Sequence, residues 1–79
     1  MDEQMRQHLS EYDRAVARCG ETYTGMSSDE RVVRQVSGRQ LEEHAPSDRT
    51  NPTCTGCEGQ PWPCTITLGA IAYSDPRLN

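Results

Sequence analysis

Hydrophobic residues recur at helical spacing near the start of the chain. They stand at intervals of four, three, four and three residues: Met5, Leu9, Tyr12, Val16 and Cys19. This periodicity places them on one face of an α-helix. Charged side chains fill the other faces, and Gly20 supplies a C-terminal stop. The pattern predicts an amphipathic helix over residues 1–20.

Two interpretations of this apolar stripe stay open. In the first, the stripe packs inside the same small domain. In the second, Met5, Leu9, Tyr12 and Val16 dock on a protein partner or on a second copy of the chain, since the remaining sequence offers little apolar surface to cover them. We take the second as the hypothesis to test. Residues 1–20 are then a possible docking element beside a domain over residues 21–79.

Two further helices are expected downstream. Ser27 and Glu30 have the spacing of a capping box, and Pro46 ends the helical segment that follows. Three valines are expected to form its apolar side: Val32, Val33 and Val36. After a polar loop, an apolar segment from Thr65 to Tyr73 predicts a short C-terminal helix, although its β-branched residues leave a strand possible.

Composition shows that this chain needs more than a hydrophobic core. Only 33% of its 79 residues are hydrophobic, with one Trp and no Phe, whereas an ordinary globular chain has roughly 45–50%. A domain this small with so little apolar material needs a metal, disulfides or a partner for stability. We therefore expect a small α-rich, metal-stapled domain.

Charge and hydropathy exclude several classes of protein. Twelve acidic residues against eight arginines give a net charge of −4, which disfavours nucleic-acid binding because phosphate contacts need a basic face. No segment approaches the roughly 18 apolar residues of a membrane span. The polar, acidic N-terminus argues against a secretory signal peptide. We expect a cytoplasmic protein, whose thiols are mostly reduced.

Three clustered cysteines carry the main chemical signal. Cys54 and Cys57 form a C-x-x-C motif, and Cys64 follows seven residues later. This spacing is typical of zinc sites, which are tetrahedral and need a fourth ligand. Two residues are candidates, His44 and Cys19. We favour His44, because it is nearer in sequence and closes a shorter loop, whereas Cys19 completes the apolar stripe of the first helix.

Residues 41–65 also resemble a motif of small actinobacterial and actinophage proteins. The motif is L-x-x-H-x-P, then C-x-x-C, then W-P-C, and its chemistry-bearing residues are present here: His44, Cys54, Cys57, Trp62 and Cys64. Most proteins with this motif have no assigned activity. The resemblance implies a metal-binding module and supports His44 as the fourth ligand, while it gives no role to the first helix.

The chain is also similar in outline to the WhiB-like regulators. Those regulators hold a [4Fe–4S] cluster with four cysteines, and here Cys19 would join the three clustered ones. That resemblance implies a redox-responsive transcription regulator. However, the chain lacks the Gly-Val/Ile-Trp-Gly-Gly turn and the basic C-terminal segment of that family.

Trp62 lies between two prolines and beside a predicted ligand. It either covers the metal site as the largest apolar side chain of the region, or it is an exposed anchor for a partner. We favour the covering role and keep Trp62 as a candidate partner contact.

Catalytic motifs are missing from the sequence. It has no phosphate-binding Gly-rich loop, nucleophile elbow or zinc-deaminase pattern, and a saturated thiolate site leaves no position for water. We therefore predict a non-enzymatic, zinc-binding protein–protein interaction module without a small-molecule substrate. A redox-responsive regulator of the WhiB-like type is the first alternative, and a zinc-containing nucleic-acid-binding protein is the second.

Overall fold

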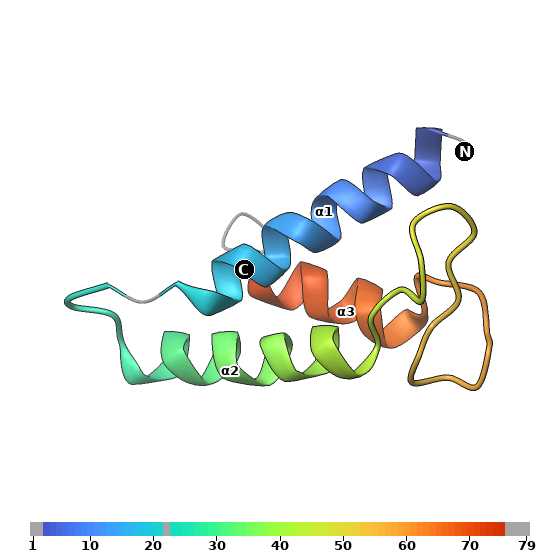
Figure 1. The fold of residues 1–79 in the computed structure, drawn as a ribbon. Helices are drawn as coiled ribbons and strands as arrows, with labels where there is room; N and C mark the ends of the chain where they lie inside the picture. Colours follow the sequence, from blue (N-terminus) through green and yellow to red (C-terminus); the bar gives the residue numbers. More distant parts are fainter. Residues whose placement is uncertain (1–2, 22, 76–79) are drawn as a thin grey trace.

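The structure, a computed structural model, describes residues 3–21 and 23–75. Three helices follow one another along the chain: α1 (Glu3–Gly20), α2 (Ser28–Glu43) and α3 (Thr65–Ser74). Each helix packs against the other two, and the loop between α2 and α3 closes one end of the molecule (Figure 1). The described residues contain only isolated β-bridges and no strand. The predicted small α-rich fold is confirmed.

Side chains at the helix starts set the boundaries of α2 and α3. The Ser27 hydroxyl accepts a hydrogen bond from the backbone N–H of Glu30 at 3.1 Å, as the capping-box spacing predicts. At α3 the cap is Cys64, whose sulfur accepts from the backbone N–H of Thr67 at 3.4 Å. A cysteine thus both begins the last helix and belongs to the predicted metal site.

All three helices contribute to the first core cluster. Its buried residues are Ala15, Leu41, Ala70 and Ile71. Cys19 packs against this cluster from α1. Burial raises the pKa of its thiol, so Cys19 behaves as a small hydrophobe of the helix interface.

A second core cluster joins α1 to the loop between α2 and α3. Leu9, Cys54 and Trp62 are buried together, with 6%, 1% and 1% of their surfaces exposed. Met5 and Tyr12 pack against this cluster from α1. The apolar stripe of α1 is therefore divided between the inside and the outside of the domain.

This division corrects the prediction for Leu9, one of the four stripe residues expected to contact a partner. Leu9 lies inside the domain, whereas Val16 is 45% exposed. The apolar side expected for α2 also differs, since Val32 and Val36 are exposed while Ser37 and Leu41 are buried. The inner face of α2 is thus lined partly by small residues.

A glycine allows α1 and α2 to approach each other closely. A Cβ atom added at Gly38 would lie 3.3 Å from the Cβ of Cys19, a tight contact between the helices. A larger side chain at this position crowds the α1–α2 interface, because packed interiors absorb added volume poorly.

Two arginines bind the ends of neighbouring helices. The Arg18 guanidinium donates to the Ser74 carbonyl at 2.8 Å, at the end of α3. Arg34 on α2 donates to the carbonyls of Arg18 and Glu21 at 2.7 and 2.8 Å, at the end of α1. These bonds satisfy carbonyls that a helix terminus leaves without intrahelical partners. They hold the helix ends together at the side opposite the loop.

The close contact at Gly38 gives a first test of this packing. Gly38→Val is expected to lower the free energy of unfolding by about 1–3 kcal/mol, because it overpacks the α1–α2 interface. The matched control is Gly69→Val, since a Cβ atom at Gly69 on α3 meets nothing within 4 Å. Urea denaturation followed by circular dichroism measures both. Equal stability of the two variants would contradict this packing.

Candidate metal centre

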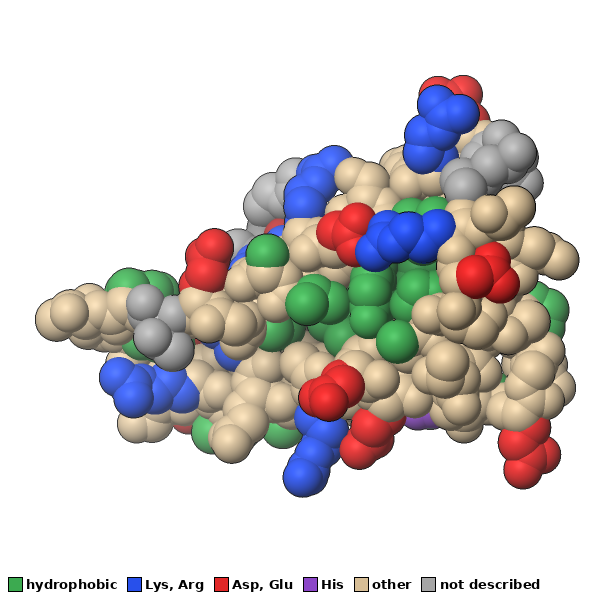
Figure 2. Space-filling model, viewed as in Figure 1, with side chains coloured by type: hydrophobic (Ala, Val, Ile, Leu, Met, Phe, Trp, Pro, Cys, Tyr) green, Lys and Arg blue, Asp and Glu red, His purple; other side chains and the backbone are tan. Residues whose placement is uncertain are grey.

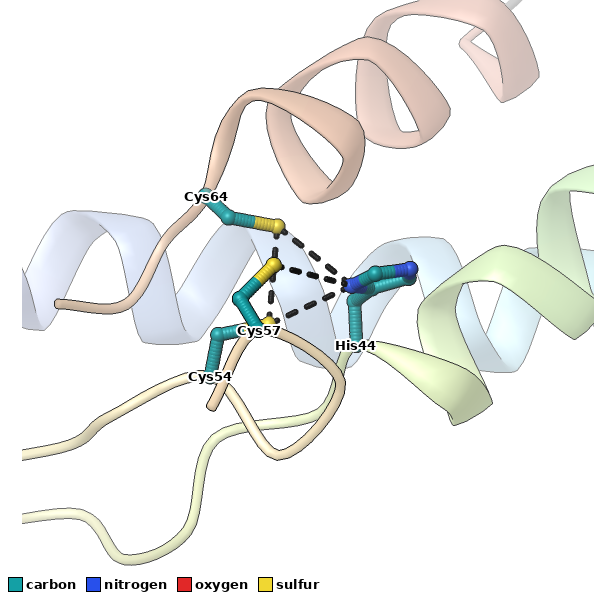
Figure 3. Close-up of side chains that lie close together, drawn as sticks. All are labelled: His44, Cys54, Cys57 and Cys64. Carbon is teal, nitrogen blue, oxygen red and sulfur yellow. Dashed lines mark hydrogen bonds between the residues drawn. The ribbon is translucent and has the colours of Figure 1, made fainter. Parts of the chain in front are cut away.

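Four side chains from separate parts of the chain converge at one point (Figure 3). His44 follows α2, Cys54 and Cys57 lie in the loop, and Cys64 begins α3. Their nitrogen and sulfur donor atoms all lie within 4.8 Å of one another. The structure thus brings together the four residues predicted as ligands from the sequence.

The distances between the donor atoms have the size of a single-ion site. Nδ1 of His44 lies 3.3 Å from Sγ of Cys54, 3.5 Å from Sγ of Cys57 and 3.7 Å from Sγ of Cys64. Tetrahedron edges are about 1.6 times the centre-to-corner distance, so zinc bonds of about 2.0–2.3 Å require donor separations of about 3.3–3.8 Å. The four residues therefore fit a metal such as zinc.

Backbone hydrogen bonds from three directions fix His44 at the end of α2. Its N–H donates to the carbonyl of Gln40 at 2.9 Å. Its carbonyl accepts from the Trp62 indole N–H at 3.1 Å and from the Thr67 hydroxyl at 2.9 Å. The loop and α3 thereby hold the residue whose imidazole faces the sulfurs. Such surrounding bonds orient the ligands of metal sites.

The C-x-x-C turn lies directly against the end of α2. A Cβ atom added at Gly56 would stand 2.4 Å from the carbonyl oxygen of Glu43 and 2.8 Å from Nδ1 of His44. Only glycine fits such an approach. Gly56 therefore lets both cysteines of the motif reach the imidazole.

Short backbone contacts hold the rest of the loop in place. Isolated antiparallel bridges pair Pro46 with Cys54 and Thr53 with Pro61. The N–H of Cys54 donates to the carbonyl of Gln60 at 2.8 Å. The ligand-bearing segment thus folds back on itself twice with little regular secondary structure.

Trp62 covers the centre from the side of α1. Its ring is buried against Leu9 and Cys54 and meets the Tyr12 ring edge-on, with 5.4 Å between ring centroids. The Tyr12 hydroxyl in turn donates to the carbonyl of Leu41 at 3.2 Å. With 1% of its surface exposed, Trp62 has the covering role, and the alternative of an exposed partner contact is not what the structure shows.

The thiols of the centre have unequal pKa values. Burial raises the pKa of Cys64, but hydrogen bonds from the side chain and backbone of Thr67, with those from Cys54 and Cys57, outweigh it and lower the pKa to about 6. A hydrogen bond with Cys54, then burial, then the neighbouring Cys64 raise the pKa of Cys57 to about 11. Negative charge on one sulfur disfavours charge on the next. A bound cation would remove this repulsion.

The structure also places two further residues that bear on the sequence predictions, Cys19 and Thr67. Cys19, the alternative fourth ligand, lies outside the group of four and packs in the core. Thr67 was missed as a supporting residue, although its position three residues after Cys64 has the spacing of a helix N-cap.

Comparisons with known proteins leave the resemblances untested. No family model, curated protein or solved structure matches this chain. Within the described residues, no helix combines the length and apolar character needed to cross a bilayer. What is known of the centre therefore comes from its geometry.

The two histidines of the chain provide a matched test of the ligand set. His44→Ala is expected to weaken zinc binding more than about 100-fold, because changes to supporting residues alone cost about 10–100-fold. His8→Ala, in the middle of α1, should retain one zinc ion per chain. Competition with a chromophoric zinc chelator measures both affinities. Full zinc binding by His44→Ala, together with its loss in Cys19→Ser, would contradict the assignment.

Proposed function

We propose that this chain is a small zinc-binding protein–protein interaction module, an adaptor, inhibitor or regulator that lacks enzymatic turnover. The observation that carries the proposal is the group His44, Cys54, Cys57 and Cys64, with all donor atoms within 4.8 Å. Four protein donors complete a tetrahedral site, as in structural zinc centres, whereas catalytic zinc keeps a position open for water. The ion would hold the fold.

The ligand set supports zinc over an iron–sulfur cluster. A cluster of the WhiB-like type would need Cys19 as its fourth ligand. Here Cys19 packs against the core cluster of Ala15 and Leu41, while His44 stands beside the other three sulfurs. One imidazole and three thiolates around one point are a common structural zinc site.

The arrangement of arginines supports a protein partner over nucleic acid. Arg18 and Arg34 bind helix-end carbonyls, and Arg49 forms a bidentate pair with Asp13 at 3.0 and 2.6 Å. These cations are already engaged within a chain of net charge −4. Binding to the phosphate groups of a nucleic-acid backbone would need a free basic face instead.

A shallow apolar groove between α1 and α2 is the proposed contact surface. The residues that line it are Tyr12, Val16, Cys19, Gly20, Gly38, Glu42 and Ala45. Hydrophobic side chains gather on this face between the two helices (Figure 2). The proposed partner contact thus keeps Tyr12 and Val16 from the original stripe. It leaves out Leu9 and Trp62, which are buried, and Met5, which packs against the second core cluster.

Exposed valines on different helices allow a matched test of this surface. Val16→Asp is expected to abolish recovery of the partner from the native host, or self-association measured by light scattering, because it places a charge in the groove. The variant should bind as much zinc as the parent protein, and its melting temperature should lie within a few degrees of the parent value. Val32→Asp, at a 55% exposed position on α2, is the control and should keep both interactions.

Two other outcomes would contradict the proposed contact surface. If Val16→Asp keeps every interaction of the parent protein while Val32→Asp loses them, the contact surface lies on the outer face of α2. If neither variant changes any interaction, the groove has no role in recognition.

A further inference from the structure

Two cysteines of the metal centre border an open hollow on the surface of the protein. The hollow has a volume of about 400 Å³, and Cys57 and Cys64 line it together with Pro61, Pro63 and Ile66. Cys54, in contrast, is 1% exposed and lies beneath Trp62 and Leu9. A small polar molecule can therefore approach Cys57 and Cys64 from the side of this hollow.

Cys64, which is half-buried and borders the hollow, lies beside the buried Cys54. Their Sγ atoms lie 3.5 Å apart (Figure 3). Thr67 holds the Cys64 sulfur in place through its backbone N–H at 3.4 Å and its hydroxyl at 3.3 Å. A disulfide bond needs about 2.05 Å between the sulfurs, so a small side-chain movement suffices to join them.

We propose that Cys64 is a modification site for hydroperoxides and that Cys54 is its resolving partner. Oxidation would form a Cys54–Cys64 disulfide and release the metal ion. This inference rests on the zinc centre of the proposed function and adds a chemical response to it. The reacting class is a small hydroperoxide, for which hydrogen peroxide is the simplest probe.

The oxidation takes place in two steps. The Cys64 thiolate attacks one oxygen of hydrogen peroxide, the O–O bond breaks, and one proton is taken up to give Cys64 sulfenic acid and water. The Cys54 thiolate then attacks the Cys64 sulfur, the S–O bond breaks, and a second proton completes another water. Two thiolates, one peroxide and two protons yield one disulfide and two waters.

Release of the ion follows from the loss of two ligands. Only His44 and Cys57 would keep free donor atoms, and two donors do not hold zinc in competition with water. The start of α3 would then be tied covalently to the loop, while the end of α2 would lose its link to the centre. A thiol reductant together with zinc should reverse the change.

A disulfide between Cys54 and Cys57 is the alternative to this pairing. Cys54 and Cys57 form a C-x-x-C motif, whose neighbouring cysteines can form a disulfide. In the structure, both are ligands from one turn, and only Cys57 of that pair reaches the hollow. Cys19 lies outside the group of four and packs in the helix interface. The proposed Cys54–Cys64 disulfide therefore depends on how the fold places these two cysteines, and not on their spacing in the sequence.

Peroxide treatment of the zinc-loaded protein tests the proposal directly. Cleavage after Glu58 separates the peptide with Cys54 and Cys57 from the peptide with Cys64, and tandem mass spectrometry of the linked peptides identifies the pair. We expect a Cys54–Cys64 link, one zinc ion released per link, and a dimedone adduct on Cys64 when the reagent is present. Cys19→Ser is the matched control and should behave like the parent protein.

Other outcomes overturn the proposal. A link between Cys54 and Cys57 or between Cys57 and Cys64, any link to Cys19, or retention of zinc after oxidation would each do so. If the purified protein binds no zinc at all, the proposed function fails. The linked peptides then still decide whether Cys54 and Cys64 form the reactive pair.

Discussion

Crowding of three sulfurs and one imidazole around a single point is the constraint on which this structure depends. Thiolates this close repel one another unless a cation lies between them. The chain is only 33% hydrophobic, so its apolar clusters are small. Structural zinc contributes about 10–16 kcal/mol in zinc-finger peptides at neutral pH, which equals the whole stability of many domains. The centre joins the end of α2, the loop and the start of α3 in one contact.

Hydrogen bonds and packing contacts connect this centre to the rest of the domain. The His44 carbonyl accepts from Trp62 and Thr67, which links the ligands to the loop and to α3. Trp62 packs on Leu9 and Tyr12, which links them to α1. The residues that cover the metal centre therefore also hold one part of the first helix, while Ala15 packs in the other core cluster. Val16, the exposed residue of its apolar stripe, belongs to the proposed contact surface.

Some of these features follow from the sequence, and others depend on packing. The C-x-x-C motif, Cys64 and His44 identify the ligand group because few residue types bind soft cations, yet spacing alone leaves Cys19 as an alternative. The stripe of α1 predicts a helix but not which side is covered. That depends on where Trp62 and α3 lie. Likewise, Val32 and Val36 of α2 are exposed, whereas the buried side of α2 carries Ser37 and Leu41, and Gly38 lets α1 approach closely.

The most direct test of this account is the amide spectrum of the isotope-labelled protein during removal of zinc by a chelator. We predict that the dispersed amide signals of α2, the loop and α3 collapse together as zinc is lost, and that one equivalent of zinc restores them. A fully zinc-free protein that keeps its dispersed spectrum would contradict the central claim, because the apolar clusters would then suffice to hold the fold.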